Sequence, residues 1–175
     1  VLIFRLGDPN TDVVGLLTLL GAAGFNGLVS ASIALILQFI FAQVLGITTI
    51  LQLLELSRPD HPLLQLILRN APGTYQHSLQ IANLAEQAAE LIGADATLVR
   101  VGALYHDAGK ARQPHYFIEN QVPGSHNPHE DLDPYESAQV IIQHVPDGLE
   151  LADKHRLPGR IKDFIAEHHG NLITM

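Results

Sequence analysis

The stretch Leu104-Tyr105-His106-Asp107-Ala108-Gly109-Lys110 decides how the second half of this sequence is interpreted. A histidine and an aspartate stand side by side at the end of an apolar run with helical spacing, and a glycine and a lysine follow them. Neighbouring residues on a helix point about 100° apart, so His106 and Asp107 can reach different ligands from one helix end. The stretch therefore predicts a helix that ends in a polar site.

Other histidines occupy positions that a helical fold can bring to the same point: His77, His144, His168 and His169. His77 is expected in the first turns of a helix, and the others are expected near helix ends. Imidazole and carboxylate ligands suit borderline metals such as manganese, iron or zinc. The alternative for any single one is a solvent-exposed histidine favoured by the helix dipole. Taken together with Asp107, the set favours a metal site.

The chemistry that this ligand set would support is phosphoryl transfer. Asp107 has two carboxylate oxygens and can bridge two ions. Two ions about 3.5–4 Å apart lower the pKa of a bridging water and clamp both oxygens of an in-line displacement. Lys110 follows in a glycine-flanked stop and could pair with a phosphate oxygen. The sequence thus predicts a two-metal phosphodiesterase site with Asp107 and Lys110 in catalytic roles.

The first part of the chain is predicted to be a membrane segment, residues 1–56. No Lys, Arg, Asp or Glu lies between Val13 and Leu54, and a span needs about 20 mostly apolar residues. The clearest span is residues 27–46. Gly24-Phe25-Asn26-Gly27 predicts either a turn between two helices or a kink in one. A buried helix of a soluble protein and a cleaved signal peptide fit this run less well.

The ends of the membrane segment give three further expectations. Residues 1–6 are interpreted as the tail of an earlier span, and residues 46–56 as a helix that continues out of the bilayer. Ser57-Arg58-Pro59-Asp60-His61-Pro62 marks the exit into a second domain, residues 57–175. Because the chain starts without an initiator Met inside an apolar run, we interpret it as a piece of a longer protein.

The second domain is predicted to be all-α, since no alternating strand pattern appears in it. One helix is expected to open at Ala71-Pro72-Gly73-Thr74 and stop at Gly93, and Asp95 is expected to cap the next. Asp133-Pro134-Tyr135-Glu136 is a strong start signal for a third helix. Pro146-Asp147-Gly148 is expected to break that helix. The last one is predicted from Leu157-Pro158 to His168-His169-Gly170.

An irregular connection is predicted over residues 111–132. A loop of this length in a compact domain usually has a function or is mobile. Tyr116 and Phe117 could stack on a nucleobase or simply pin the loop, and Arg112 could assist with phosphate. The remaining histidines are expected to be solvated: His61, His115, His126, His129 and His155.

Composition excludes some classes of function. The net charge is −8 with neutral histidine, and there is no cysteine. Disulfides and thiolate zinc sites are therefore excluded. The acidic balance argues against a non-specific binder of nucleic-acid polymers, which would show a basic face.

The histidine pattern resembles the HD phosphohydrolase superfamily, and specifically its HDIG-type branch. Further stretches are similar to the seven-transmembrane HD receptors, which are membrane-bound cyclic di-AMP phosphodiesterases of bacteria: Leu53 to Ser57, His61 to Leu64, Ala71 to Ser78 and Tyr116 to Gln121. The resemblance implies an all-α fold in which one or more transmembrane helices precede an HD-type helical bundle. The bundle would be cytoplasmic and the helices would lie in the bacterial inner membrane.

The resemblance also implies roles for single residues. His77, His106, Asp107, His144 and His168 would bind two divalent ions, iron or manganese, and His169 would bind metal or phosphate. The substrate would be a cyclic dinucleotide, and a homo-oligomer is possible. The family pattern departs at Ala108, where isoleucine is usual, and its last aspartate ligand would lie beyond Met175. The domain is thus expected to be truncated, and this part of the protein alone to be inactive.

Three rival functions are considered. A cyclic di-GMP phosphodiesterase of the HD-GYP branch would carry Gly-Tyr-Pro after the paired histidines, whereas Gly170-Asn171-Leu172 follows here. Another HD-type nucleotide phosphohydrolase or ribonuclease is the second rival. A catalytically silent nucleotide-binding receptor domain is the third.

Overall fold

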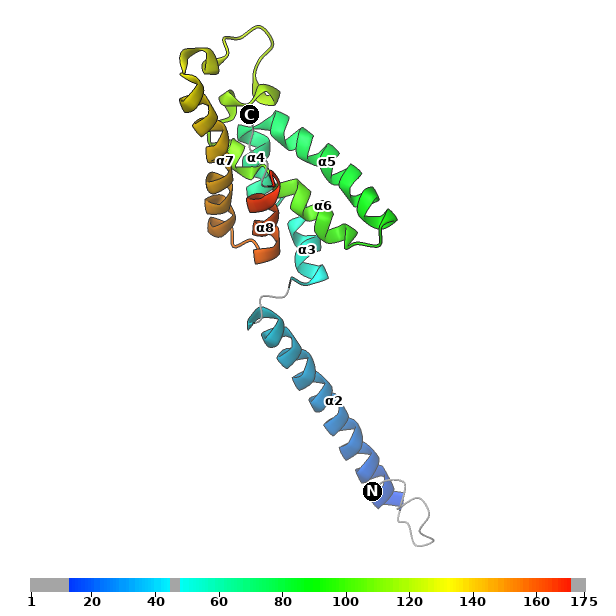
Figure 1. Ribbon diagram of the computed structural model, residues 1–175. Helices are drawn as coiled ribbons and strands as arrows, with labels where there is room; N and C mark the ends of the chain where they lie inside the picture. The colour runs from blue at the N-terminus through cyan, green and yellow to red at the C-terminus, as the bar shows by residue number, and fades with distance from the viewer. Residues whose placement is uncertain (1–12, 45–47, 171–175) are drawn as a thin grey trace. The chain divides into compact units, whose positions relative to one another are not determined.

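The computed structural model describes residues 13–44 and 48–170, and none of these residues is in a β-strand. The predicted all-α fold is confirmed. The chain divides into two compact units, residues 1–47 and residues 48–175. Figure 1 shows the helices of both units.

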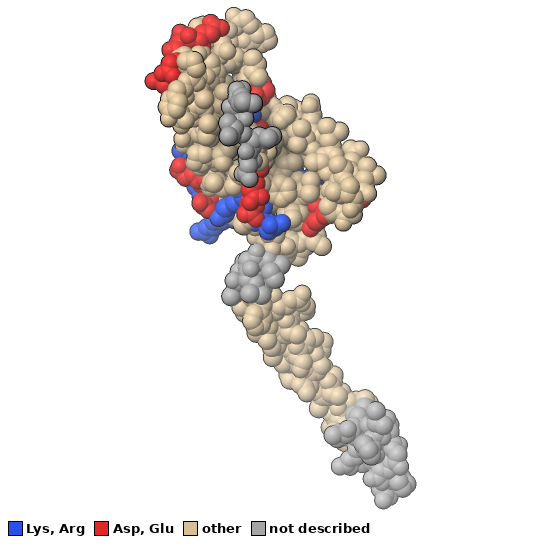
Figure 2. All heavy atoms as spheres, viewed as in Figure 1, with Lys and Arg blue, Asp and Glu red and all other residues tan. Residues whose placement is uncertain are grey.

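The described part of the first unit, residues 13–44, forms one long helix, α2, over Val13–Val44. Residues Val13–Phe41 have a mean hydropathy of 1.8 and are long and apolar enough to cross a membrane, and Figure 2 shows no charged side chain along the helix. The helix begins at Val13, ahead of the predicted span of residues 27–46, and it continues through Gly24 and Gly27 without a turn. A glycine inside a helix costs only about 1 kcal/mol relative to alanine. The predicted tail at residues 1–6 lies outside the described residues.

The second unit begins with a short helix, α3, over Ile50–Leu56. The expectation of a helix continuing from residue 46 is wrong for the described part, because the Thr49 hydroxyl caps a new helix by accepting from the Gln52 N–H at 3.3 Å. Leu53 and Leu56 are buried in the second unit. The structure therefore divides the chain between residues 47 and 48, and α3 belongs with the helical bundle.

Three further helices follow, and side chains cap the starts of α4 and α6. Helix α4 covers Pro62–Asn70, α5 covers Pro72–Leu91 and α6 covers Ala96–Tyr105. The Asp95 carboxylate caps α6 by accepting from the Leu98 N–H at 2.9 Å, as predicted. Gly93 lies two residues beyond the end of α5 and has a φ of +71°, a left-handed conformation that glycine adopts without strain.

The connection after α6 contains four 3-10 turns rather than irregular chain. These are η1 (Ala108–Arg112), η2 (Pro114–Tyr116), η3 (Ile118–Asn120) and η4 (Pro128–Asp131).

Helix α7 then covers Pro134–Lys154 without a break, so the predicted interruption at Pro146 is wrong. Asp133 caps α7 as predicted, accepting from the N–H groups of Tyr135 and Glu136. A proline removes one hydrogen bond from the helix interior, and tertiary packing of the helix offsets that loss. The last described helix, α8, covers Gly159–Glu167.

Two close approaches at glycines position the site. A Cβ on Gly109 would lie 1.8 Å from the His144 carbonyl oxygen, so η1 is pressed against the middle of α7. A Cβ on Gly102 would lie 2.4 Å from the Phe164 ring, so α6 also packs closely against α8. The buried core between these helices includes Tyr105, Ile161 and Ile165, each with no exposed surface. The end of α6 is thereby held against both α7 and α8.

Candidate metal centre

The side chain of Asp107 lies at the end of α6 and is 4% exposed. Its Oδ2 is 3.1 Å from His106 Nε2 and 2.9 Å from Lys110 Nζ. Its Oδ1 is 3.5 Å from His144 Nε2 and 3.6 Å from His168 Nε2. The two carboxylate oxygens therefore face different histidines, which come from different helices.

Asp107 and the five histidines form two groups of three residues. Within each group, the ligand atoms lie within 4.8 Å of one another. One group contains His77 from α5, His106 and Asp107 itself. The other contains His144 from α7 with His168 and His169 at the end of α8. The structure thus brings together all six residues that the sequence singled out as ligands.

Backbone carbonyls orient three of these imidazoles. The Nδ1 of His106 bonds to the Ala103 carbonyl at 2.8 Å, and that of His168 bonds to the Ile165 carbonyl at 2.9 Å. His144 makes the same contact with the Ile141 carbonyl. A carbonyl can only accept, so Nδ1 carries the proton and, in the neutral ring, Nε2 keeps its lone pair. The ring nitrogens that face Asp107 are therefore in the form that binds metal.

Contacts between the histidines are also suited to holding a cation. His144 Nε2 lies 3.3 Å from His168 Nε2 and 3.0 Å from His169 Nε2. Two lone pairs cannot bond to each other, so the arrangement requires a proton or a cation between them. Converging imidazoles around a buried carboxylate suit a divalent transition metal. The donor set therefore fits a metal ion in chemistry and in orientation.

The pKa values of these groups agree with such a role. Burial works against ionisation of Asp107, but the neighbouring His106, His168 and Lys110 lower the pKa of this carboxyl far below its usual range. Burial lowers the pKa of His144, and burial together with the neighbouring histidines lowers that of His169. For His106, burial opposes protonation, yet Asp107 raises its pKa. The centre thus combines an ionised carboxylate with two histidines, His144 and His169, whose lowered pKa values favour the neutral ring.

Lys110 lies between two carboxylates. Its Nζ is 2.9 Å from Asp107 Oδ2 and 3.1 Å from Glu119 Oε1, and it stands 5.0 Å from the centre of the Phe117 ring. Burial alone would lower the pKa of Lys110, but the two carboxylates raise it. The lysine is therefore a fixed, half-buried cation beside the histidine groups.

The other residues proposed for substrate contact have partners within the protein. Phe117 is buried and its ring packs edge-on against His144 at 5.8 Å, which favours the loop-pinning interpretation. Tyr116 contacts the rings of His115 and His129. The exposed Arg112 forms an ion pair with Glu150 at 2.6 Å.

Several of the remaining histidines are not solvated as expected. His129 donates from Nε2 to the Tyr116 carbonyl at 2.9 Å, and its Nδ1 accepts from the Ser137 hydroxyl at 2.7 Å. His61 caps α4, and its ring lies 6.4 Å from that of His155. These half-buried histidines fasten chain segments together, whereas His115 and His126 are exposed.

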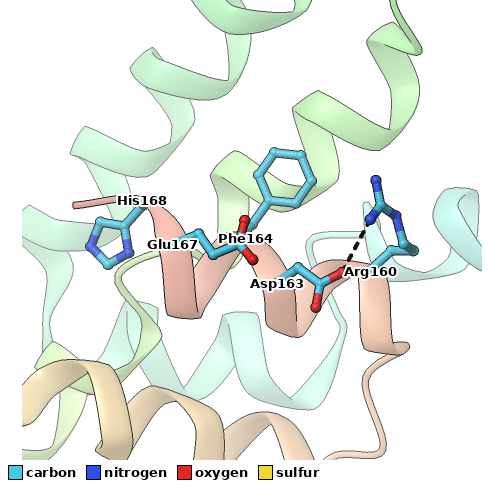
Figure 3. A pocket seen from close by; sticks show the side chains of 5 residues that line it. All are labelled: Arg160, Asp163, Phe164, Glu167 and His168. Atoms are coloured by element: carbon cyan, nitrogen blue, oxygen red, sulfur yellow. Dashed lines mark hydrogen bonds and ion pairs between the residues drawn. The ribbon is translucent and has the colours of Figure 1, made fainter. Parts of the chain in front are cut away.

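A shallow hollow of about 260 Å³ adjoins the centre along one face of α8. Figure 3 shows the side chains that line it: Arg160, Asp163, Phe164, Glu167 and His168. Asp163 is held by Arg160 at 3.2 Å. Because His168 also belongs to the second histidine group, the hollow and the centre share a side chain.

The profile of the HD domain family matches residues 74–175, which contain the whole histidine–aspartate centre. The chain belongs to the HD domain family. It is 43% identical over 173 residues to the cyclic-di-AMP phosphodiesterase PgpH of Listeria monocytogenes, covering 99% of this chain and 24% of that protein. The Bacillus subtilis PgpH is 44% identical over 157 residues, covering 90% of this chain and 22% of the relative.

A solved structure supports the same relationship. The crystal structure of the L. monocytogenes PgpH HD domain in complex with cyclic-di-AMP has a TM-score of 0.63 and 49% identity. The match covers 67% of this chain and 54% of the crystallised one. The chain thus spans about a quarter of the length of the PgpH relatives and about half of that HD domain.

Sequence reasoning missed Glu119 and the residues that hold it. Glu119 Oε1 accepts from Thr74 Oγ1 at 2.9 Å in addition to Lys110. Nothing in its spacing from the His-Asp pair distinguishes an acid in a loop from a solvated one. Only the folding of the loop onto α5 reveals the contact.

Proposed function

We propose that this chain is part of a membrane-anchored, metal-dependent phosphodiesterase that hydrolyses cyclic di-AMP to the linear dinucleotide. The observation that carries the proposal is the arrangement of five imidazoles in two groups at Asp107, with His106 facing one of its oxygens and His144 and His168 the other. The similarity to PgpH supports the substrate. The PgpH likeness and the lack of a Gly-Tyr-Pro motif favour cyclic di-AMP over cyclic di-GMP.

Two divalent ions, iron or manganese, would be held by the two groups. His77 and His106 would bind one ion, His144, His168 and His169 would bind the other, and Asp107 would bridge them. When bound, such a pair supplies an activated water and a Lewis-acid clamp on the phosphate oxygens. Backbone carbonyls accept hydrogen bonds from Nδ1 of His106, His144 and His168, so the Nε2 lone pairs of these rings would be available to bind metal.

Two charged side chains, Asp107 and Lys110, would also contribute to the reaction. Burial opposes the ionisation of Asp107, but His106, His168 and the Lys110 ammonium lower the pKa of its carboxyl and keep it ionised. Lys110 stays protonated between two carboxylates and would stabilise the charge that develops on a phosphate oxygen. A half-buried position strengthens that interaction, since water screens it less.

The location of the enzyme follows from α2. We infer that α2 lies in the bacterial cell membrane and that the HD domain faces the cytoplasm, where it would meet the dinucleotide. A polymer of nucleic acid is not expected as a substrate, because the chain carries a net charge of −8. Association into a homo-oligomer remains compatible with this arrangement.

The test uses the full-length protein purified in detergent and supplied with manganese or ferrous iron. We expect cyclic di-AMP to be converted to the linear dinucleotide, and expect removal of the metal by a chelator to stop the reaction. A protein that holds no transition metal and leaves cyclic di-AMP intact would instead support the silent receptor domain.

A further inference from the structure

Glu119 is an acid of the η3 turn that lies outside both histidine groups but touches the centre through Lys110. Its Oε1 lies 3.1 Å from Lys110 Nζ, which is in turn 2.9 Å from Asp107 Oδ2. Its side chain is 25% exposed. The carboxylate is thus one step removed from the proposed ligands.

The turn that carries Glu119 is locked onto the start of α5. The Thr74 N–H donates to Asn120 Oδ1 at 3.1 Å, and Asn120 Nδ2 donates to Thr74 Oγ1 at 2.8 Å. Ala71, the residue that caps α5, offers no side-chain acceptor, so Asn120 serves a helix N–H from outside the helix. A Cβ on Gly73 would lie 1.8 Å from the Glu119 carbonyl oxygen, so the two backbones are in direct contact.

Thr74 also fixes the Glu119 side chain itself. Thr74 has no exposed surface, and its hydroxyl donates a hydrogen bond to Glu119 Oε1 at 2.9 Å. The same Glu119 oxygen also accepts a hydrogen bond from Lys110 Nζ. These contacts connect Thr74, at the start of α5, through Glu119 to Lys110. Helix α5 also carries His77.

We propose that Glu119 is a positioning residue that holds Lys110 Nζ beside Asp107 and so presents the ammonium group to the substrate phosphate. The proposal rests on the proposed phosphodiesterase function. In the described structure the lysine has two carboxylate partners, Asp107 and Glu119. If metal ions take the charge of Asp107, Glu119 is the carboxylate that keeps the long lysine side chain from turning toward solvent.

The first test is a double-mutant cycle on the full-length protein, because two residues that act through one contact are not additive. Glu119→Gln keeps an acceptor for Thr74 and removes the negative charge. We expect it to lower kcat roughly 10-fold, the scale found for groups that orient ligands, with little change in KM. In the Lys110→Met background it should lower kcat no further. Additive losses, or an unchanged kcat, would overturn the proposal.

The second test needs no turnover and therefore separates this proposal from the proposed function. Acetic anhydride is used to acylate lysines in the Asp107→Asn protein, where Glu119 is the remaining carboxylate on Lys110. Adding Glu119→Gln should raise the acylation rate of Lys110 several-fold and leave that of Lys154 unchanged. Glu130→Gln, an exposed acid of the same loop, is the matched control and should change neither rate. Equal Lys110 rates with and without Glu119 would refute positioning, even if the enzyme is active.

Discussion

Asp107 is the residue on which the other side chains converge, and its two oxygens explain why. Each oxygen has partners from a different helix, and those partners approach through nitrogens whose other ring position is already bonded to a carbonyl. A carboxamide at this position could not carry the negative charge that compensates metal ions.

Asp107→Ala removes the proposed bridge. We expect turnover of cyclic di-AMP to fall more than about 100-fold and the bound metal to fall with it. Circular dichroism should still show the helical fold, since the apolar core does not depend on the carboxylate. His115→Ala, at an exposed histidine outside the two groups, serves as the control and should keep both metal and turnover. Retained turnover in the Asp107 variant would remove the bridging role.

His61 gives a prediction about pH. Burial and the neighbouring His155 lower its pKa, so the folded protein binds fewer protons at this site than the unfolded chain. The stability from His61 is therefore present above about pH 6.5 and is lost as pH falls through that value. His61→Asn keeps a cap acceptor for the Leu63 N–H without titrating. Urea unfolding should show less acid destabilisation for this variant than for wild type; superimposable pH curves would count against the assignment.

At the scale of elements, the close approach of η1 to α7 joins the His-Asp stretch to His144. Gly109→Ala would place a methyl group 1.8 Å from the His144 carbonyl and 2.6 Å from the Gly148 nitrogen. Both are backbone atoms and cannot turn away. We expect a loss of about 2–3 kcal/mol in the free energy of unfolding, together with weaker metal binding as α7 shifts.

The matched control is Gly159→Ala at the first residue of α8, where no atom lies within 4 Å of the added Cβ. Alanine favours helix over glycine, so this variant should be neutral or slightly stabilising. Thermal melts of the two variants give the comparison. An equal effect of both substitutions would mean that the contact between η1 and α7 contributes nothing.

Helix starts could be predicted from sequence because their causes are local. Asp95 and Asp133 cap the helices that follow them, as their positions indicated. The break expected at Pro146 did not occur, because a helix held against Gly109 tolerates one missing hydrogen bond. The start of α3 at Thr49 was hidden by the apolar run around it. Local signals thus fixed beginnings better than interruptions.

At the scale of the whole molecule, the candidate site was more predictable than the domain layout. Histidines near helix ends were expected to meet, and the structure gathers the five proposed ligand histidines into two groups at Asp107. His144, however, lies in the middle of α7 and not near its end. Glu119 was missed because its contacts join residues 45 positions apart in sequence. The two compact units divide after residue 47, ahead of the predicted exit at residues 57–62, and the buried Leu53 and Leu56 belong to the core of the second unit.

The central claim is that two ions share Asp107, and anomalous diffraction from crystals of the manganese-loaded protein tests it most directly. We expect two anomalous peaks about 3.5–4 Å apart, one beside His77 and His106 and the other beside His144 and His168, with Asp107 between them. A single peak, or peaks away from Asp107, would contradict the account.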